Sequence, residues 1–159
     1  MNEKEKSLEE ILKSYANSLG RIVKDMKKPN LDFAFEFIYP DNKNNTTNQT
    51  IAIVKGKDAD FIEFSCRIII TDIDKNAIYR NNKELVLAVV RKLILFSGFN
   101  YKIEPKINRI GIIIKLYLKN KNEITKQVFF EYVDKTYRTI LLSVLTMVDF
   151  IKGRNISLI

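Results

Sequence analysis

The spacing of the apolar residues changes several times along this chain, and that change limits the fold more than any other feature. Residues 32–39 and 110–118 place an apolar side chain at every second position, as in Phe33, Phe35 and Phe37, which is the period of a β-strand. Residues 8–19 and 125–152 instead repeat their apolar side chains every three or four positions, which is the period of a helix. The chain therefore needs an α+β fold.

The order of the elements follows from these periods and from the residues that start and stop them. Ser7 and Glu10 have the spacing of a capping box, and Gly20 and Gly98 stand where helices end. No repeat or linker interrupts the chain of 159 residues, a usual length for one domain. We predict a single α+β domain over residues 1–159, with an antiparallel sheet of five to six strands packed with helices, in the order α-β-β-β-α-β-β-α.

The segment 21–28 leaves two alternatives open. Ile22, Val23 and Met26 could prolong the first helix, or Ile22, Lys24 and Met26 could form one face of a short strand. Gly20 favours the strand, because glycine interrupts a helix.

Two predicted helices carry more apolar surface than one contact would cover. Residues 84–96 are apolar on nearly every side, so we expect Val90 and Leu93 to be fully buried. In the last helix one apolar stripe is enough for docking on a sheet, and the remaining side chains need a second cover. They form our candidate surface for a homodimer or a protein client, unless Ile156 to Ile159 cover them: Leu141, Leu145, Val148 and Phe150.

The chain lacks the residues that most catalytic and metal sites use. It has no histidine, so the usual general base, the Ser-His and Cys-His pairs and the commonest metal ligand are missing. Cys66 is the only cysteine and lies in an apolar run, which indicates a buried thiol. Asp72 and Asp74 could hold a cation, but a solvated turn explains them better. We therefore predict no enzyme, no metal site and no cofactor.

The net charge of +8 is concentrated in one segment. Residues 98–127 hold seven Lys and Arg against two Glu, and their cations are interleaved with tyrosines. Nucleic-acid-binding proteins combine these two elements, although lysines on a polar sheet face also serve solubility. A nucleic-acid or ribosome-associated role is thus the alternative function, with a candidate polyanion surface of Tyr101, Lys102, Lys106, Arg109, Lys115, Tyr117, Lys119 and Lys121.

The sequence also bears on where the protein acts. The longest apolar stretch, residues 140–151, is shorter than the roughly 20 residues that span a bilayer and contains Ser143, Thr146 and Asp149. The first residues carry charges where a signal peptide would be apolar. We expect a cytoplasmic protein that has no membrane partner.

The order of the elements resembles the small α/β domain of type III secretion chaperones and of uncharacterised archaeal proteins that share it. The elements that carry the resemblance are the capped helix Ser7 to Leu19, the strands from Asp32 to Thr71, the helix Glu84 to Phe96, the hairpin Tyr101 to Lys119 and the helix after Thr125. The resemblance implies a cytoplasmic homodimer without catalytic residues, which binds extended segments of client proteins along hydrophobic patches. Such chaperones are typically acidic, whereas this chain is basic.

Overall fold

A computed structural model describes residues 6–41, 48–69, 83–104, 109–119 and 124–152. Its elements are α1 (Leu8–Ser18), β1 (Lys24–Asp25), β2 (Leu31–Tyr39), β3 (Gln49–Gly56), β4 (Phe61–Ile69), α3 (Lys83–Phe96), β5 (Asn100–Glu104), β6 (Arg109–Tyr117) and α4 (Lys126–Ile151). The α+β class and the predicted order are confirmed. The segment that the sequence left open forms the two-residue strand β1.

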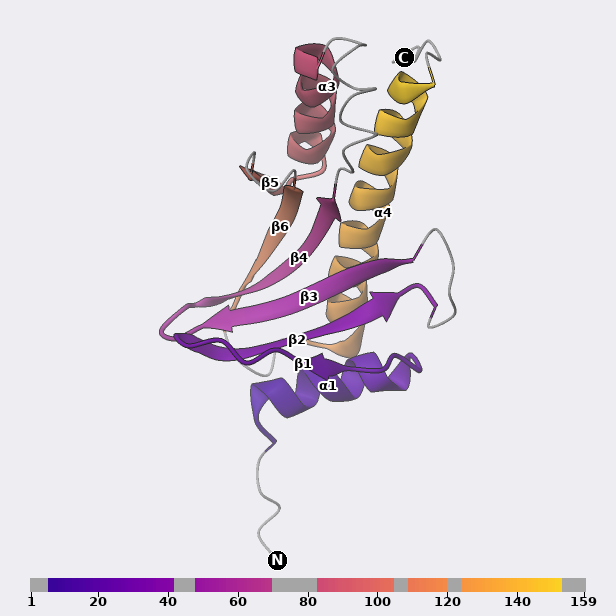
Figure 1. The fold of residues 1–159 in the computed structure, drawn as a ribbon. Helices are drawn as coiled ribbons and strands as arrows, with labels where there is room; N and C mark the ends of the chain where they lie inside the picture. Colours follow the sequence, from indigo (N-terminus) through magenta and orange to yellow (C-terminus); the bar gives the residue numbers. More distant parts are fainter. Residues whose placement is uncertain (1–5, 42–47, 70–82, 105–108, 120–123, 153–159) are drawn as a thin grey trace, which may run out of the picture.

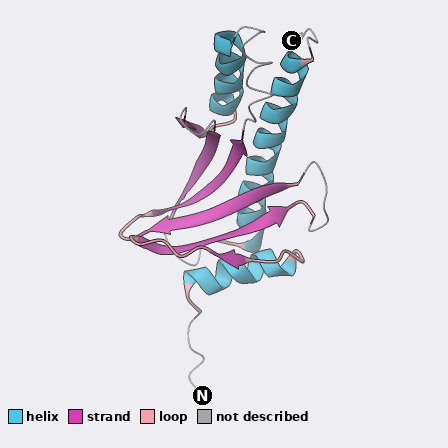
Figure 2. Ribbon diagram, in the orientation of Figure 1, coloured by secondary structure: helices cyan, strands magenta, loops and turns pink. Residues whose placement is uncertain are grey.

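The six strands form one antiparallel sheet in the order β1-β2-β3-β4-β6-β5. Strands β2 and β3 form one antiparallel pair, β5 and β6 form the pair expected as the hairpin Tyr101 to Lys119, and β4 joins the two pairs as a central strand paired on both sides. Figure 2 shows the sheet as a strongly curved ribbon with α4 running along it and α1 across its lower edge. Helix α1 and the C-terminal end of α4 lie at opposite ends of the described structure (Figure 1).

The helix ends follow the predicted capping residues. The Ser7 hydroxyl accepts from the backbone of Glu10 at 3.2 Å, and the Glu10 carboxylate accepts from the backbone of Ser7 at 2.8 Å. Thr125 caps α4 by accepting from the Val128 amide at 3.2 Å. Gly20 and Gly98 both have positive φ, 71° and 77°, which is the backbone that ends a helix and that other residues rarely adopt.

The core lies between one face of the sheet and the helices α1 and α4. Phe129 of α4 is fully buried, and its ring lies 5.8 Å from Phe64 and 6.3 Å from Phe37. Leu8 and Leu12 of α1 pack into the same cluster. No helix of the described residues lies on the opposite face of the sheet, which we call the open face. By register it carries Lys24, Ala34, Glu36, Ile38, Thr50, Ala52, Val54, Phe61, Glu63, Ser65, Arg67, Asn100, Lys102, Glu104, Arg109, Gly111, Ile113, Lys115 and Tyr117.

The prediction that α3 is covered on most sides is wrong. Val90 is 1% exposed as expected, but Leu93 is partly exposed, Leu95 is 54% exposed and Phe96 is 90% exposed. Figure 1 shows the reason: α3 stands beyond the end of the sheet and packs on the C-terminal half of α4, so only one side of it meets a neighbour among the described elements.

Candidate functional site

The C-terminal half of α4 presents an apolar surface that the described part of the chain leaves partly exposed; residues 156–159, the alternative cover, lie outside the described residues. Leu142 is 49% exposed and Leu145 is 51% exposed, while Leu141 and Val148 are partly exposed. The side chain of Phe150 lies outside the described residues. We call Leu141, Leu142, Leu145 and Val148 the α4 outer face. Leu145 lies three or four residues from each of the other three, which gathers the set on one side of the helix.

The opposite side of α4 is buried, and it carries small hydroxyl residues as well as large apolar ones. Thr136 and Ser143 are 0% exposed, and Thr146 is 6% exposed. Each hydroxyl donates to the backbone carbonyl four residues earlier at 2.8 Å, so its polar group is satisfied within the helix. The side of α4 that docks on the fold is therefore set by these residues together with Ile140 and Met147, and the α4 outer face points away from the elements that the structure describes.

The predicted polyanion surface is divided between the two faces of the sheet. Tyr101 pairs with Ile112 and packs on the helix side, where the Arg91 guanidinium lies 5.8 Å from its ring centroid. Lys115 and Tyr117 lie on the open face, and Lys102 and Arg109 occupy open-face positions by register. Lys119 is exposed just beyond β6. Lys106 and Lys121 fall outside the described residues, as do Asp72 and Asp74.

At one end of the open face, two aromatic rings and a cation form a cluster. The rings of Phe61 and Tyr117 meet edge to face with centroids 5.7 Å apart. The Lys115 ammonium lies 4.0 Å from the centre of the Phe61 ring and 4.0 Å from a carboxylate oxygen of Glu63. Tyr117 is 63% exposed, so a large part of its side chain remains accessible to a ligand.

A groove of about 390 Å³ crosses the open face over β3. Its lining includes the small side chains of Ala52 and Ser65, with Lys28 and Arg67 among its charged residues. Lys28 and Arg67 are exposed, and neither has an ion-pair partner among the residues that the structure describes. Arg67 was not among the residues singled out from the sequence. The signal available was that it is the one basic residue in the sequence of β4.

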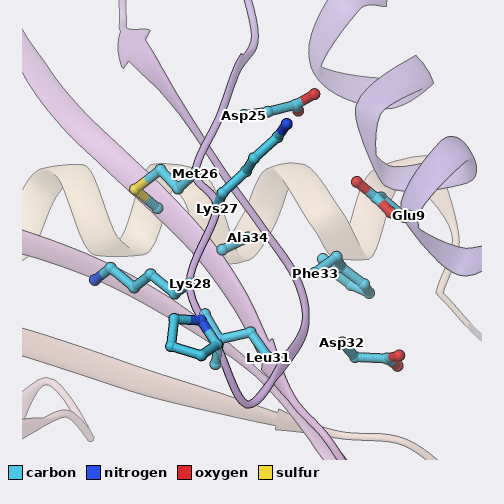
Figure 3. A pocket seen from close by; sticks show the side chains of 10 residues that line it. Glu9, Asp25, Met26, Lys27, Lys28, Leu31, Asp32, Phe33 and Ala34 are labelled. Carbon is cyan, nitrogen blue, oxygen red and sulfur yellow. The ribbon is translucent and has the colours of Figure 1, made fainter.

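A second pocket, of about 410 Å³, lies between the N-terminal part of α1 and the loop before β2 (Figure 3). Figure 3 shows Glu9 on α1 and Asp32 on β2 at one side of it, with Lys28 pointing away from them. The Lys13 ammonium bridges Glu9 and Asp25 at 2.6 Å each, and these partners, Asp25 first, raise the pKa of Lys13. Asp32 pairs with Lys55 at 3.0 Å. All three carboxylates are thus paired with ammonium groups.

No cluster of three or more His, Cys, Asp or Glu side chains that could hold a metal occurs in the described part of the chain. None of the helices within the described ranges is long and apolar enough to cross a bilayer.

Cys66 is buried on the core side of β4, with its sulfur 4.0 Å from the Gln49 side-chain oxygen. Burial raises the pKa of its thiol to about 12, although the Arg67 backbone amide opposes that shift.

We expect native protein at pH 8 to react with a thiol reagent at least about 100-fold more slowly than protein in urea, because the thiolate of Cys66 is the nucleophile. Since the unfolded thiol ionises at lower pH than the folded one, this group should also lower stability between about pH 9 and 12. Timed alkylation followed by mass measurement tests the first expectation, and equal native and unfolded rates would contradict it.

No family model and no curated protein matches the chain. A solved structure described as an uncharacterized protein from Methanothermobacter thermautotrophicus is similar, with a TM-score of 0.76 over 90% of this chain and 98% of that one. The likeness shows the fold. At 15% identity it carries no statement about activity or partners.

Proposed function

We propose that this protein is a non-enzymatic, homodimeric protein-binding domain, and that the second copy packs on the α4 outer face. The observation that carries the proposal is the half-exposure of Leu142 and Leu145 on a helix whose other side is fully docked. Large apolar side chains that cluster on a surface mark an interaction site more often than isolated ones do.

The size of the apolar effect favours association. Fully burying a leucine or valine side chain contributes about 1.5–3 kcal/mol, and the exposed fractions of the α4 outer face leave roughly half of that available at Leu142 and Leu145. A twofold axis lets one such surface supply both partners, so every contact is made twice.

The shape of the molecule fits the same arrangement. α3 and the C-terminal half of α4 form a helix pair that extends beyond the sheet (Figure 1). Two such pairs from two copies would have the helix number of a four-helix bundle, an assembly in which apolar helix faces cover one another. Phe96, 90% exposed at the end of α3, would then lie close to the sheet and beside the bundle.

The proposal extends to a chaperone-like role in the cytoplasm. It is supported by the resemblance to type III secretion chaperones in element order and by the exposed Leu95 and Phe96, which offer apolar surface to a client segment. The basic net charge of +8 would favour acidic clients over basic ones.

We expect the wild-type protein to be a dimer at micromolar concentration and Leu145→Glu to be a monomer, because the variant would place a carboxylate without a partner in the interface. Ile38→Glu is the matched control: Ile38 is 44% exposed, close to the 51% of Leu145, but lies on the open face of the sheet. Light scattering coupled to size exclusion measures the mass of each form. A monomeric wild type, or an equal loss of dimer in both variants, would refute a dimer built on α4.

A further inference from the structure

One row of residues across the open face concentrates positive charge around a glycine. The register aligns Arg67 of β4 with Gly111 of β6, and Gly111 with Lys102 of β5. Residues side by side in such a row have Cβ positions about 4.5–5.5 Å apart. Because Gly111 has no side chain, the backbone of β6 is bare between two basic positions. Arg109 lies two residues before Gly111 in β6, at a position on the same face by register.

The acidic side chains described on the open face, Glu36 and Glu63, lie opposite other cations than Arg67. Glu63 lies opposite Lys115, with the charged atoms 4.0 Å apart, and Glu36 lies opposite Lys24 at the same distance. Glu104 is aligned with Arg109 by register. Glu63 and Glu36 thus each have a basic neighbour, and Arg67 is left without one among the side chains that the structure describes. Arg67 is exposed and has no ion pair within the described ranges.

The same face carries an accessible aromatic ring at a useful distance from that row. Tyr117 lies six residues beyond Gly111 on β6, which corresponds to about 20 Å of strand. Its neighbour Phe61 supports it edge to face, and Lys115 of the same cluster lies two residues nearer to the basic row on β6. A single-stranded nucleic acid presents a line of phosphates and unstacked bases. Basic residues along β6 and its neighbours could contact the phosphates, and the exposed Tyr117 ring could stack on a base.

From this arrangement we infer that the open face binds single-stranded nucleic acid along β4 and β6. A phosphate lies against Arg67 over the bare backbone of Gly111, in the row that Lys102 shares by register, and a base stacks on Tyr117. A duplex hides the faces of its bases within the stack, and an acidic peptide has no base to stack, so the exposed ring selects a single strand. The inference does not depend on the proposed dimer, because none of the residues it uses belongs to the α4 outer face.

The test is a titration of fluorescently labelled 12-nucleotide single strands of DNA and RNA, followed by anisotropy at 50 and 200 mM salt. Wild type should bind, and its affinity should fall with salt, with each phosphate contact adding about 0.7 to the slope of log affinity against log salt. Arg67→Ala should weaken binding several-fold and reduce that slope by about 0.7. Tyr117→Ala should weaken it about 10-fold or more, and Tyr117→Phe should restore it, because stacking needs only the ring.

Lys27→Ala is the matched control. It removes the same charge from an exposed lysine near β1, three strands away from β4 in the sheet, and should leave the affinity unchanged. Thermal unfolding of each variant confirms that it is folded. The inference is overturned if wild type does not bind at 50 mM salt, if Lys27→Ala loses as much affinity as Arg67→Ala, or if duplex or poly-glutamate competes as well as the unlabelled single strand.

Discussion

Replacing Phe129 by alanine is expected to lower the free energy of unfolding by about 3–5 kcal/mol. Phe129 is 0% exposed, and its ring touches aromatic side chains from α1, β2, β4 and α4 itself, with the Tyr15 ring 5.9 Å away. The cavity left by the ring would lie where α1, α4 and the sheet meet. Few neighbours could collapse into it, because the strands around it are held by backbone hydrogen bonds.

Phe130→Ala is the control for this change, since it removes the same ring from the next position of α4. Phe130 is only partly buried, so we expect a loss less than half as large. Urea denaturation at constant protein concentration gives both values, provided that the slope with urea stays the same. Equal losses in the two variants would contradict the placement of Phe129 at the centre of the core.

The strands and helix ends could be predicted because their signals are local. Phe33, Phe35 and Phe37 alternate in sequence, and the pleat of β2 alone places all three on the buried face. Gly20 and Gly98 mark helix ends because a positive φ is a property of the residue itself. The six-strand count depended on the segment 21–28, whose short apolar pattern fits two periods, and the register with Glu36 and Phe35 of β2 decides it.

The environment of α3 could not be predicted in the same way. A helix that is apolar on all sides needs cover on all sides, but the sequence does not say whether that cover belongs to the same chain. The sheet ends before α3 and leaves Leu95 and Phe96 exposed. The spacing of apolar residues in α4 likewise could not show that Thr136 and Ser143 are buried. Their hydroxyls can be buried because each one donates to a backbone carbonyl of the same helix.

The candidate polyanion surface illustrates the limit of arguments from neighbouring positions. Lysines and tyrosines that follow one another on a hairpin point alternately to the two faces, so Tyr101 and Lys115 cannot serve one ligand. The residue that completes the basic row, Arg67, comes from β4, more than 40 positions before Gly111. Only the pairing of β4 with β6, which skips β5, brings the two together.

The second large effect is expected at Ile94, where alanine should cost about 2–5 kcal/mol of unfolding free energy. Ile94 is 0% exposed, and its carbonyl accepts the Phe99 amide at 3.2 Å in the turn that ends α3 at Gly98. The loss would therefore open a cavity where α3 joins the fold and turns into β5.

Leu93→Ala is its neighbour and control, and it replaces the residue that the sequence predicted to be fully buried. Because Leu93 is partly exposed, we expect a loss less than half that of Ile94→Ala when both are measured by urea denaturation at low protein concentration. The comparison also reports on assembly, since a residue covered only by a second copy contributes more as the protein concentration rises. A Leu93→Ala loss that equals the Ile94→Ala loss at every concentration would mean that the chain itself buries both sides of α3, and that the helix pair is closed without a partner.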